Sequence, residues 1–159
     1  MDKIHTEFIK RQYRSGLDSY EKLTKEIGLW DSEKYVFHKY LKKKDKVLDL
    51  GCGTGRTTFP LHKLGFTDII GVDLTPEMIE IARELNSYFN TEIKFEIGDA
   101  TSLEFSDSSF DAIIFSFNGL MSIPNAQFRD KAAAEINRCL KKMVHLFLPP
   151  TIEKKNISI

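Results

Sequence analysis

Residues 47–55 read VLDLGCGTG, and this stretch decides the fold. Its first four residues predict a short buried strand, and the glycines that follow predict a tight turn at the carboxyl end of that strand. Glycines at this place let a ligand approach the backbone, because no Cβ stands in the way. A plain turn between a strand and a helix would use glycine as well, so the loop alone is weak evidence for a ligand site.

Outward from this loop, short apolar runs alternate with segments of helical periodicity. Gly65 suits the end of a helix that follows the loop, and Thr75 with Pro76 suits the start of the next helix. Repeated alternation of this kind predicts a doubly wound α/β fold with a mostly parallel sheet of about five strands. We expect strands at 47–50, 68–73, 93–97, 110–117 and 143–148, and helices at 56–64, from 76 onward and at 127–140.

The first 40 residues are polar, with apolar side chains at loose helical spacing. They predict two short amphipathic helices, interrupted near Ser15-Gly16, and a third helix at about 32–41. Helices of this kind often cover one face or the mouth of a domain. The length of 159 residues suits a single domain.

The composition narrows the class of protein. The chain carries 23 Lys and Arg against 23 Asp and Glu, so its net charge is zero. A membrane span needs an apolar run of ~20 residues, which excludes a membrane protein. A nonspecific nucleic-acid coat needs a basic surplus, so the balanced charge disfavours it. The cysteines, Cys52 and Cys139, have no partner at metal-ligand spacing, and the N-terminus lacks the apolar stretch of a secretory signal. We therefore expect a cytoplasmic protein without a metal.

Two aspartates support a nucleoside site. Asp73 ends the second strand, where a carboxylate can accept hydrogen bonds from a ribose diol, although capping of the following helix explains it equally well. Asp99 ends the third strand, where it can meet an adenine or simply stabilise a turn. Arg56 occupies the position where the dinucleotide motif has its third glycine, which here falls at Gly55. The pattern therefore favours a nucleoside with a small charged tail over a dinucleotide or a triphosphate.

Four ordered segments resemble the motifs of one family, the class I S-adenosylmethionine-dependent methyltransferases. Residues 47–55 resemble its first motif, and 71–78 (GVDLTPEM) its second. Residues 96–100 (EIGDA) resemble the third motif, and 105–111 (FSDSSFD) the segment that introduces the fourth strand. The resemblance covers about 44–141. It implies S-adenosyl-L-methionine as the cofactor and transfer of its methyl group as the reaction.

The resemblance also implies roles for individual residues. The glycine loop, with Cys52, would pack against the methionine part of the cofactor through its three glycines: Gly51, Gly53 and Gly55. Asp49 would support that loop or meet the amino group of the cofactor.

The adenosine part is expected between the second and third motifs. Asp73 would hold the ribose, and the adenine would meet four side chains: Leu74, Met78, Asp99 and Ala100. Ser116 would line the space between methyl donor and acceptor, and Phe117 and Asn118 would face the substrate. Met78 has a simpler explanation as a core residue, because it has helical spacing to Ala82.

The sequence identifies neither the acceptor nor a general base. Four histidines are candidates by type only: His5, His38, His62 and His145. Tyr13 and Tyr20 could reach over the cofactor from the N-terminal helices, although amphipathic packing is the simpler interpretation. We predict a methyltransferase for a small-molecule acceptor. The alternatives are a cofactor-binding module without transferase activity and, less favoured because of Arg56 and the spacing of Gly55, an NAD(P)-dependent oxidoreductase.

The resemblance divides the chain and ends before its C-terminus. We expect a helical cap at 1–42, a cofactor-binding α/β core at 44–148 and an irregular tail at 149–159. Family members usually continue into a helix and two more strands, so a shortened gene product is our hypothesis. The strand at 143–148 would then leave an apolar edge, which predicts self-association as a two-fold dimer.

Overall fold

The computed structural model describes residues 1–116, 119–141 and 146–147. Three helices come first: α1 (Lys3–Arg14), α2 (Leu17–Glu26) and α3 (Asp31–Tyr40). Strands and helices then alternate: β1 (Val47–Leu50), α4 (Thr58–Lys63), β2 (Ile69–Asp73), α5 (Pro76–Phe89), β3 (Lys94–Ile97), β4 (Ala112–Ile114), α6 (Ala126–Cys139) and β5 (Leu146–Phe147). The predicted break near Ser15-Gly16 and the predicted start of α5 at Pro76 are confirmed.

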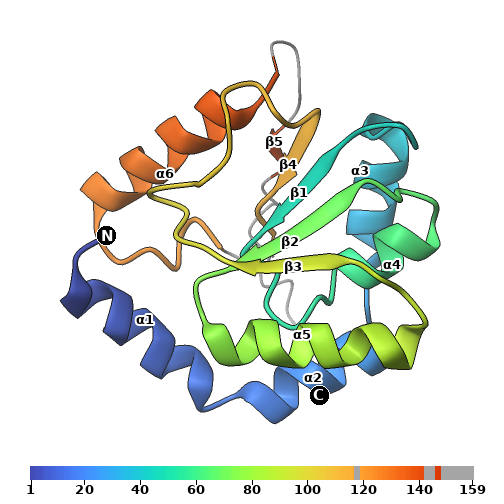
Figure 1. Cartoon of the computed structure of the whole chain (residues 1–159), viewed down its shortest axis with the longest axis horizontal. Helices are drawn as coiled ribbons and strands as arrows, with labels where there is room; N and C mark the ends of the chain where they lie inside the picture. Colours follow the sequence, from blue (N-terminus) through green and yellow to red (C-terminus); the bar gives the residue numbers. More distant parts are fainter. Residues whose placement is uncertain (117–118, 142–145, 148–159) are drawn as a thin grey trace, which may run out of the picture.

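The strands form one parallel sheet in the order β3-β2-β1-β4-β5 (Figure 1). The chain moves outward from β1 to β2 and β3, and then returns to the other side of β1 to form β4. This reversal leaves a crevice at the carboxyl ends of β1 and β4, where ligands bind in doubly wound sheets. The doubly wound fold predicted from the sequence is confirmed.

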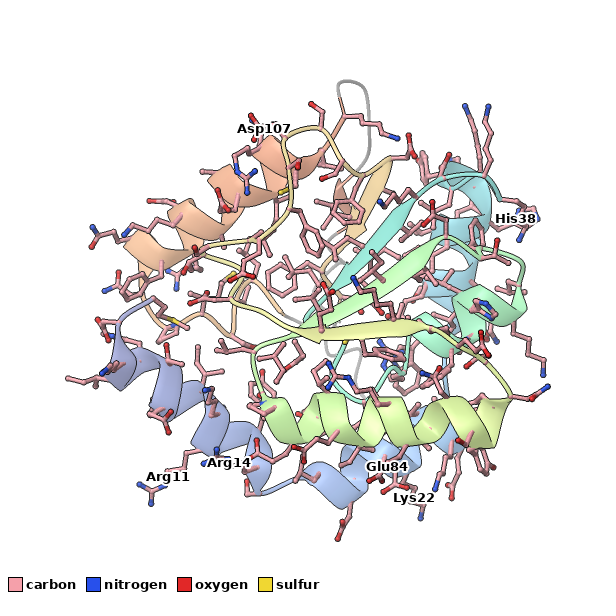
Figure 2. All side chains as sticks on the ribbon, in the orientation of Figure 1. Arg11, Arg14, Lys22, His38, Glu84 and Asp107 are labelled. Atoms are coloured by element: carbon pink, nitrogen blue, oxygen red, sulfur yellow. The ribbon has the colours of Figure 1, made fainter. Side chains whose placement is uncertain are left out.

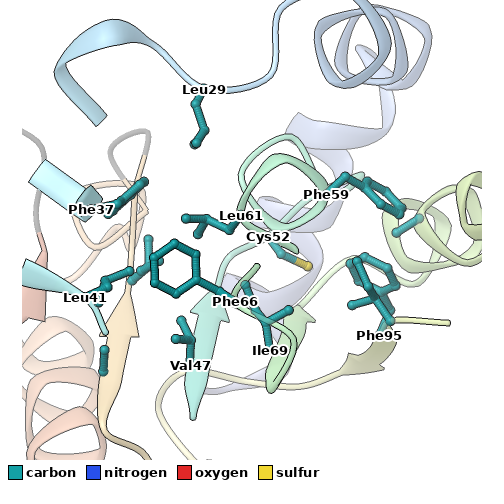
Figure 3. Packing of buried hydrophobic residues seen from close by; sticks show 14 of the residues in the cluster. Leu29, Phe37, Leu41, Val47, Cys52, Phe59, Leu61, Phe66, Ile69 and Phe95 are labelled. Carbon is teal, nitrogen blue, oxygen red and sulfur yellow. The ribbon is translucent and has the colours of Figure 1, made fainter. Parts of the chain in front are cut away.

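Both faces of the sheet are covered. One buried cluster lies between the sheet and α3, α4 and α5, and contains Phe37, Leu61 and Phe95 (Figure 3). A second cluster, with Phe110 and Ile136, packs the other face against α6. Because successive strand residues point to opposite faces, β1 contributes to both clusters and is buried along its whole length.

β4 is much shorter than the sequence predicts, and β2 and β3 each begin one residue later. β4 spans only Ala112–Ile114, and Phe110 before it makes a separate parallel bridge with Leu140, directly after α6. β5 covers Leu146–Phe147 of the expected 143–148, and the rest of that segment lies outside the described residues. In the described ranges, no helix is long and apolar enough to cross a membrane.

Charged side chains lie around the periphery. Figure 2 shows Arg11 and Lys22 pointing outward from α1 and α2, and His38 doing the same from α3. Arg11 and Lys22 are exposed. His38 lies away from the ligand edge of the sheet.

Candidate functional site

A cavity of about 130 Å³ lies at the carboxyl edge of the sheet. Its walls come from the glycine loop after β1, the segments after β2, β3 and β4, and the N-terminal helices α1 and α2. Nine residues that the sequence assigned to the site line it: Gly51, Cys52, Gly53, Asp73, Leu74, Met78, Asp99, Ala100 and Ser116. Asp49 and Gly55 do not line it, and Phe117 and Asn118 lie outside the described residues.

The glycine loop has two differently placed sides. Gly53 has a φ of +54°, and a Cβ added there would meet only the Met78 sulfur, at 4.0 Å. Its backbone is thus open to a ligand in the cavity. Gly55 has a φ of +91°, and a Cβ there would lie 2.6 Å from the Phe59 ring. Gly55 therefore serves the packing of α4 against the sheet.

Asp73 joins the loop to α5. One carboxylate oxygen accepts the N–H of Gly53 at 2.9 Å, and the other accepts the N–H of Thr75 at 2.8 Å. Burial raises the pKa of Asp73, and these N–H groups oppose the shift. Each carboxylate oxygen keeps a further lone pair, so Asp73 can cap the turn and still accept hydrogen bonds from a diol.

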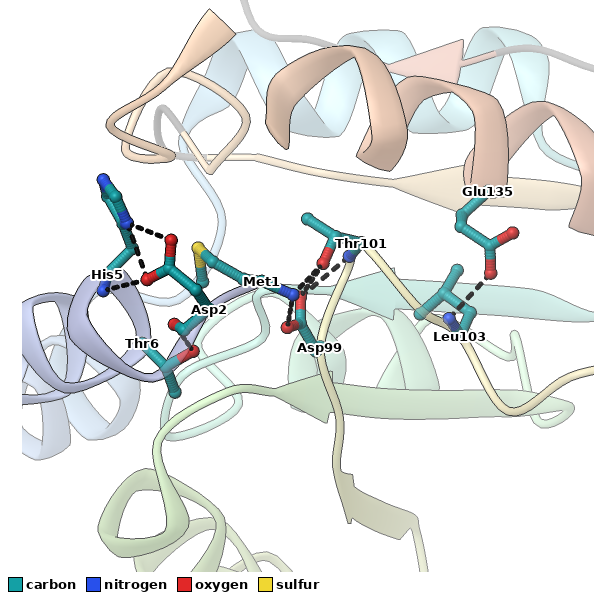
Figure 4. Close-up of polar contacts among 8 residues, drawn as sticks. All are labelled: Met1, Asp2, His5, Thr6, Asp99, Thr101, Leu103 and Glu135. Atoms are coloured by element: carbon teal, nitrogen blue, oxygen red, sulfur yellow. Dashed lines mark hydrogen bonds and ion pairs between the residues drawn. The ribbon is translucent and has the colours of Figure 1, made fainter. Parts of the chain in front are cut away.

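Asp99 holds the amino end of the chain at the cavity (Figure 4). One carboxylate oxygen accepts both the N–H and the hydroxyl of Thr101 at 2.8 Å. The other accepts the α-ammonium group of Met1 at 2.9 Å, and that group also contacts the Thr101 hydroxyl. Although burial opposes it, these hydrogen bonds lower the pKa of Asp99. Asp99 is therefore an anion that already holds an amino group.

Asp49 points away from the cavity, toward α4. Its carboxylate accepts the hydroxyl of Thr58 at 2.6 Å, and the residue is only 1% exposed. Burial raises the pKa of Asp49 to about 7, although the Thr58 hydrogen bond and the Arg56 charge oppose the shift. Of the two roles that the resemblance implied, this position suits support of the loop.

A polar wall lies where β4 ends. The Ser116 hydroxyl is 3.2 Å from that of Thr57 and 3.4 Å from an Arg56 nitrogen, and all three residues line the cavity. The Arg56 guanidinium makes a bidentate ion pair with the Glu33 carboxylate, with nitrogen–oxygen distances of 2.8 and 2.7 Å. Ser116 was predicted to line the site, but Arg56 stands out in the sequence only as a departure from the dinucleotide pattern, so its part in this wall was not predicted.

The N-terminal helices close the cavity from outside the sheet. Tyr13 donates a hydrogen bond to Ser122 at 2.8 Å, and the Tyr13 and Tyr20 rings lie 5.9 Å apart. Both tyrosines line the cavity, as do Met1 and Ser122. The sequence left two interpretations open for these tyrosines, and their place in the lining agrees with a reach over the cavity rather than with amphipathic packing alone. Burial, together with the nearby Tyr13 and Asp73, raises the pKa of Tyr20.

The histidines take no part in the cavity as far as the structure describes it. His5 bonds to Asp2 at the start of α1 and packs on the Phe128 ring. His38 and His62 lie on α3 and α4, away from the cavity lining, and His145 lies outside the described residues. Among the described residues, no cluster of side chains could hold a metal ion.

The arrangement fits a nucleoside with a charged tail. An open glycine backbone, a carboxylate with spare lone pairs and a second carboxylate that binds an amino group surround one cavity. Apolar side chains, among them Met78 and Phe115, line it as well. Most small-molecule sites combine an apolar lining with a few such polar groups.

Comparison with known proteins supports this interpretation. Residues 47–143 match the family model described as "Methyltransferase domain". A Drosophila melanogaster eEF1A lysine and N-terminal methyltransferase homolog is 40% identical over 73 residues, 46% of this chain and 11% of its own length. Phosphoethanolamine N-methyltransferase 3 of Arabidopsis thaliana is 34% identical over 118 residues, 70% of this chain and 24% of its own. The chain thus spans less than a quarter of the length of these relatives.

Solved structures share the fold. An S-adenosylmethionine-dependent methyltransferase of Methanosarcina mazei superposes with a TM-score of 0.68 at 30% identity, covering 77% of this chain and 57% of that one. A protein of Pyrococcus horikoshii OT3 has the same TM-score at 33% identity, covering 74% of this chain and 54% of that one.

Proposed function

The chain belongs to the class I S-adenosylmethionine-dependent methyltransferase superfamily, and from this premise we propose that it transfers the methyl group of S-adenosylmethionine to a small-molecule acceptor. One observation carries the proposal. Gly53 opens toward a cavity in which Asp73 and Asp99 stand at neighbouring strand ends. The cavity residues match the family motifs at these positions.

The cofactor supplies a methyl group on a positively charged sulfur. In the proposed complex, Asp73 accepts the ribose hydroxyls, and the loop at Gly51 and Gly53 receives the methionine part. Asp99 accepts the adenine amino group, next to Ala100, in place of the Met1 ammonium group that it holds in the structure. The residues act chiefly by orientation, since holding nucleophile, methyl carbon and sulfur in line can supply ~7–11 kcal/mol. The apolar lining limits water, which would otherwise compete for the reacting centre.

Tyr13 of α1 and Tyr20 of α2 form the roof of the cavity. This roof favours the proposal that the acceptor is a small molecule. Both side chains lie over the same space as Asp73. Both named relatives act on nitrogen, one on phosphoethanolamine and the other on lysine and the protein N-terminus. We therefore propose amines as the first acceptors to examine, with the small molecule favoured over the protein because of the roof.

Calorimetric titration tests the cofactor. We expect S-adenosylmethionine and its demethylated product, S-adenosylhomocysteine, to bind, and NAD(P) not to bind. Binding of NAD(P) alone would replace the proposal with the oxidoreductase alternative.

A transfer assay tests the acceptor class. The protein is incubated with methyl-labelled S-adenosylmethionine and either phosphoethanolamine, other small amines or a lysine-rich protein. Label on a small amine supports the proposal, and label on the protein alone contradicts it. Cofactor binding without transfer to any member of a broad acceptor panel would favour the binding-module alternative.

Domain division, compartment and self-association are proposals as well. We propose that the chain divides into a cap at 1–42, a core at 44–148 and a tail at 149–159, and that it works in the cytoplasm, where its two buried, free cysteines would stay reduced. We also propose self-association through 143–148, of which the structure describes only Leu146–Phe147. Light scattering with and without 143–159 tests it, and a monomer at high micromolar concentration contradicts it.

A further inference from the structure

We propose that Arg56 is a positioning residue that couples the N-terminal helices to the glycine loop, so that cofactor binding and closure of the roof are one event. The inference rests on the proposed function, because it needs the cofactor to bind at this loop. It adds a residue to which neither the motifs nor the relatives give a role.

Arg56 reaches from the loop to the N-terminal helices. One guanidinium nitrogen donates to the carbonyl of Gly28 at 2.7 Å and to Glu33 at 2.8 Å, and the other donates to Glu33 at 2.7 Å. Gly28 lies in the turn between α2 and α3, and Glu33 lies in the first turn of α3. A single side chain of the loop thus holds the junction of two N-terminal helices.

The ion pair between Arg56 and Glu33 is buried. Arg56 is 8% exposed and Glu33 is 6% exposed. Charges buried to this degree are favourable only in good geometry with their remaining hydrogen bonds satisfied, and Glu33 also accepts the N–H of Trp30 at 2.9 Å. Any movement of the helices away from the loop would separate the two charges and leave each buried without its partner, which costs free energy.

Thr54 provides a second connection from the same loop to the N-terminal helices. Its hydroxyl donates to the carbonyl of Tyr20 at 3.0 Å and lies 2.7 Å from the hydroxyl of Thr24. Tyr20 and Thr24 belong to α2, and Tyr20 lines the cavity. The loop that offers Gly53 to the ligand therefore also fixes the helix that roofs it.

Arg56 also reaches the wall at the end of β4. Its guanidinium lies 3.4 Å from the Ser116 hydroxyl, and both residues line the cavity. Since both terminal guanidinium nitrogens bond to Glu33, the Arg56 charge is compensated within the protein. Its role is therefore to position the roof and the Ser116 wall, rather than to bind an anionic acceptor.

Two measurements on the full chain test the coupling. S-adenosylhomocysteine is titrated by calorimetry, and amide hydrogen exchange is followed over α2 and α3 with and without this ligand. In the wild type we expect ligand binding to slow exchange in both helices. Binding that leaves exchange in α2 and α3 unchanged overturns the inference but not the proposed function.

A double variant separates positioning from stability. Arg56→Met alone leaves Glu33 as an unpaired buried charge and can impair folding. Glu33→Gln combined with Arg56→Met removes both charges, while the amide oxygen introduced at position 33 can still accept the N–H of Trp30. We expect this double variant to melt at a higher temperature than Arg56→Met alone, to bind S-adenosylhomocysteine at least tenfold more weakly than the wild type, and to lose the ligand-dependent protection of α2 and α3.

A more exposed ion pair outside the cavity lining serves as the control. Arg138 pairs with Glu135 on α6 at 2.8 Å, away from the cavity lining. Glu135→Gln combined with Arg138→Met should leave binding within twofold of the wild type. The Glu33/Arg56 variant could bind S-adenosylhomocysteine as tightly as this control and show the same ligand-dependent slowing of exchange in α2 and α3. In that case Arg56 has only a structural role and the inference fails. If the wild type does not bind S-adenosylhomocysteine, the proposed function fails, and the inference fails with it.

Discussion

Asp49 lies inside β1 and Asp73 ends the neighbouring strand β2, and the two carboxylates face different parts of the molecule. In the parallel register Asp49 pairs with Gly71, and Leu50 with Val72, so Asp73 lies one residue beyond the end of β1. Asp49 therefore remains inside the sheet and bonds to Thr58 of α4. Asp73 projects past the edge, where the backbone N–H groups of Gly53 and Thr75 hold it against the cavity. The register thus separates a structural carboxylate from one that can bind a ligand.

The glycine loop also has one residue that packs against the core and one that faces the cavity. Gly55 faces the Phe59 ring on the packed side, and Gly53 faces the cavity. Changes on the packed side should act on folding, and changes on the cavity side should act on binding.

The largest effect is expected at the packed glycine. Gly55→Val strains the backbone, because a branched residue is then held at a φ of +91°, and it drives a Cβ into the Phe59 ring. Backbone strain and overpacking cost roughly 1–3 kcal/mol each, so the free energy of unfolding should fall by roughly 2–6 kcal/mol or folding should fail. Urea unfolding followed by circular dichroism measures this.

Gly53→Val is the matched control on the cavity side. Its Cβ has no close neighbour, so it should fold with only the backbone strain and should lose S-adenosylhomocysteine binding more completely than any aspartate variant. Tight binding by Gly53→Val, or equal stability of the two variants, would contradict the two-sided loop.

The next largest effect is on stability, and it depends on the pH through the buried carboxyl group of Asp49. Burial raises the pKa of Asp49 from 3.8 to about 7, so between these values the folded protein keeps a proton that the unfolded chain releases. The stability that Asp49 contributes is full below about pH 4 and is lost as the pH rises to about 7.

Asp49→Asn removes this dependence. The wild type loses stability from about pH 4 to about pH 7, and the variant does not. The difference in free energy of unfolding, variant minus wild type, should therefore grow by up to about 4 kcal/mol over this range, because one pKa unit corresponds to about 1.4 kcal/mol. Urea unfolding of both proteins at about pH 4, 5.5, 7 and 8 gives the difference across the window in which the carboxyl titrates. Parallel pH profiles would place the titrating group elsewhere.

A smaller effect is expected at the cavity carboxylate. Asp73→Ala should fold and should weaken S-adenosylhomocysteine binding by roughly 1.5–3 kcal/mol, the range for hydrogen bonds to a charged group. Calorimetry measures the loss, and the unfolding transition confirms the fold. Unchanged affinity in the folded variant would move the ribose away from Asp73.

The smallest effect is expected in the roof. Tyr13→Phe removes the hydrogen bond to Ser122 while keeping the ring, so the free energy of unfolding should fall by about 0.5–1.5 kcal/mol. Thermal unfolding measures it, with Tyr35→Phe as an exposed control on α3. If Tyr13→Phe and Tyr35→Phe unfold at the same temperature, the Tyr13–Ser122 hydrogen bond does not stabilise the roof.

Local sequence patterns predict the sheet and most of the residues that line the cavity at its carboxyl edge. Strand periodicity, the glycines and the aspartates after β2 and β3 are local signals, and parallel strands end at one edge of the sheet. Asp73 and Asp99 therefore had to meet near Gly53 once the fold was recognised. The helices α1, α2 and α3 were predicted for the same reason, since each carries its own apolar periodicity.

The roof and the partners of the loop come from contacts between segments that lie far apart in the sequence. Glu33 lies 23 residues from Arg56, Ser122 lies 109 from Tyr13, and the ammonium group of Met1 lies 98 residues from Asp99. No local pattern predicts such pairs, because they depend on how the N-terminal helices dock on the sheet. The side that Asp49 faces was also a tertiary outcome, because the register of β1 against β2 sets which carboxylate is enclosed by α4 and which one reaches the cavity.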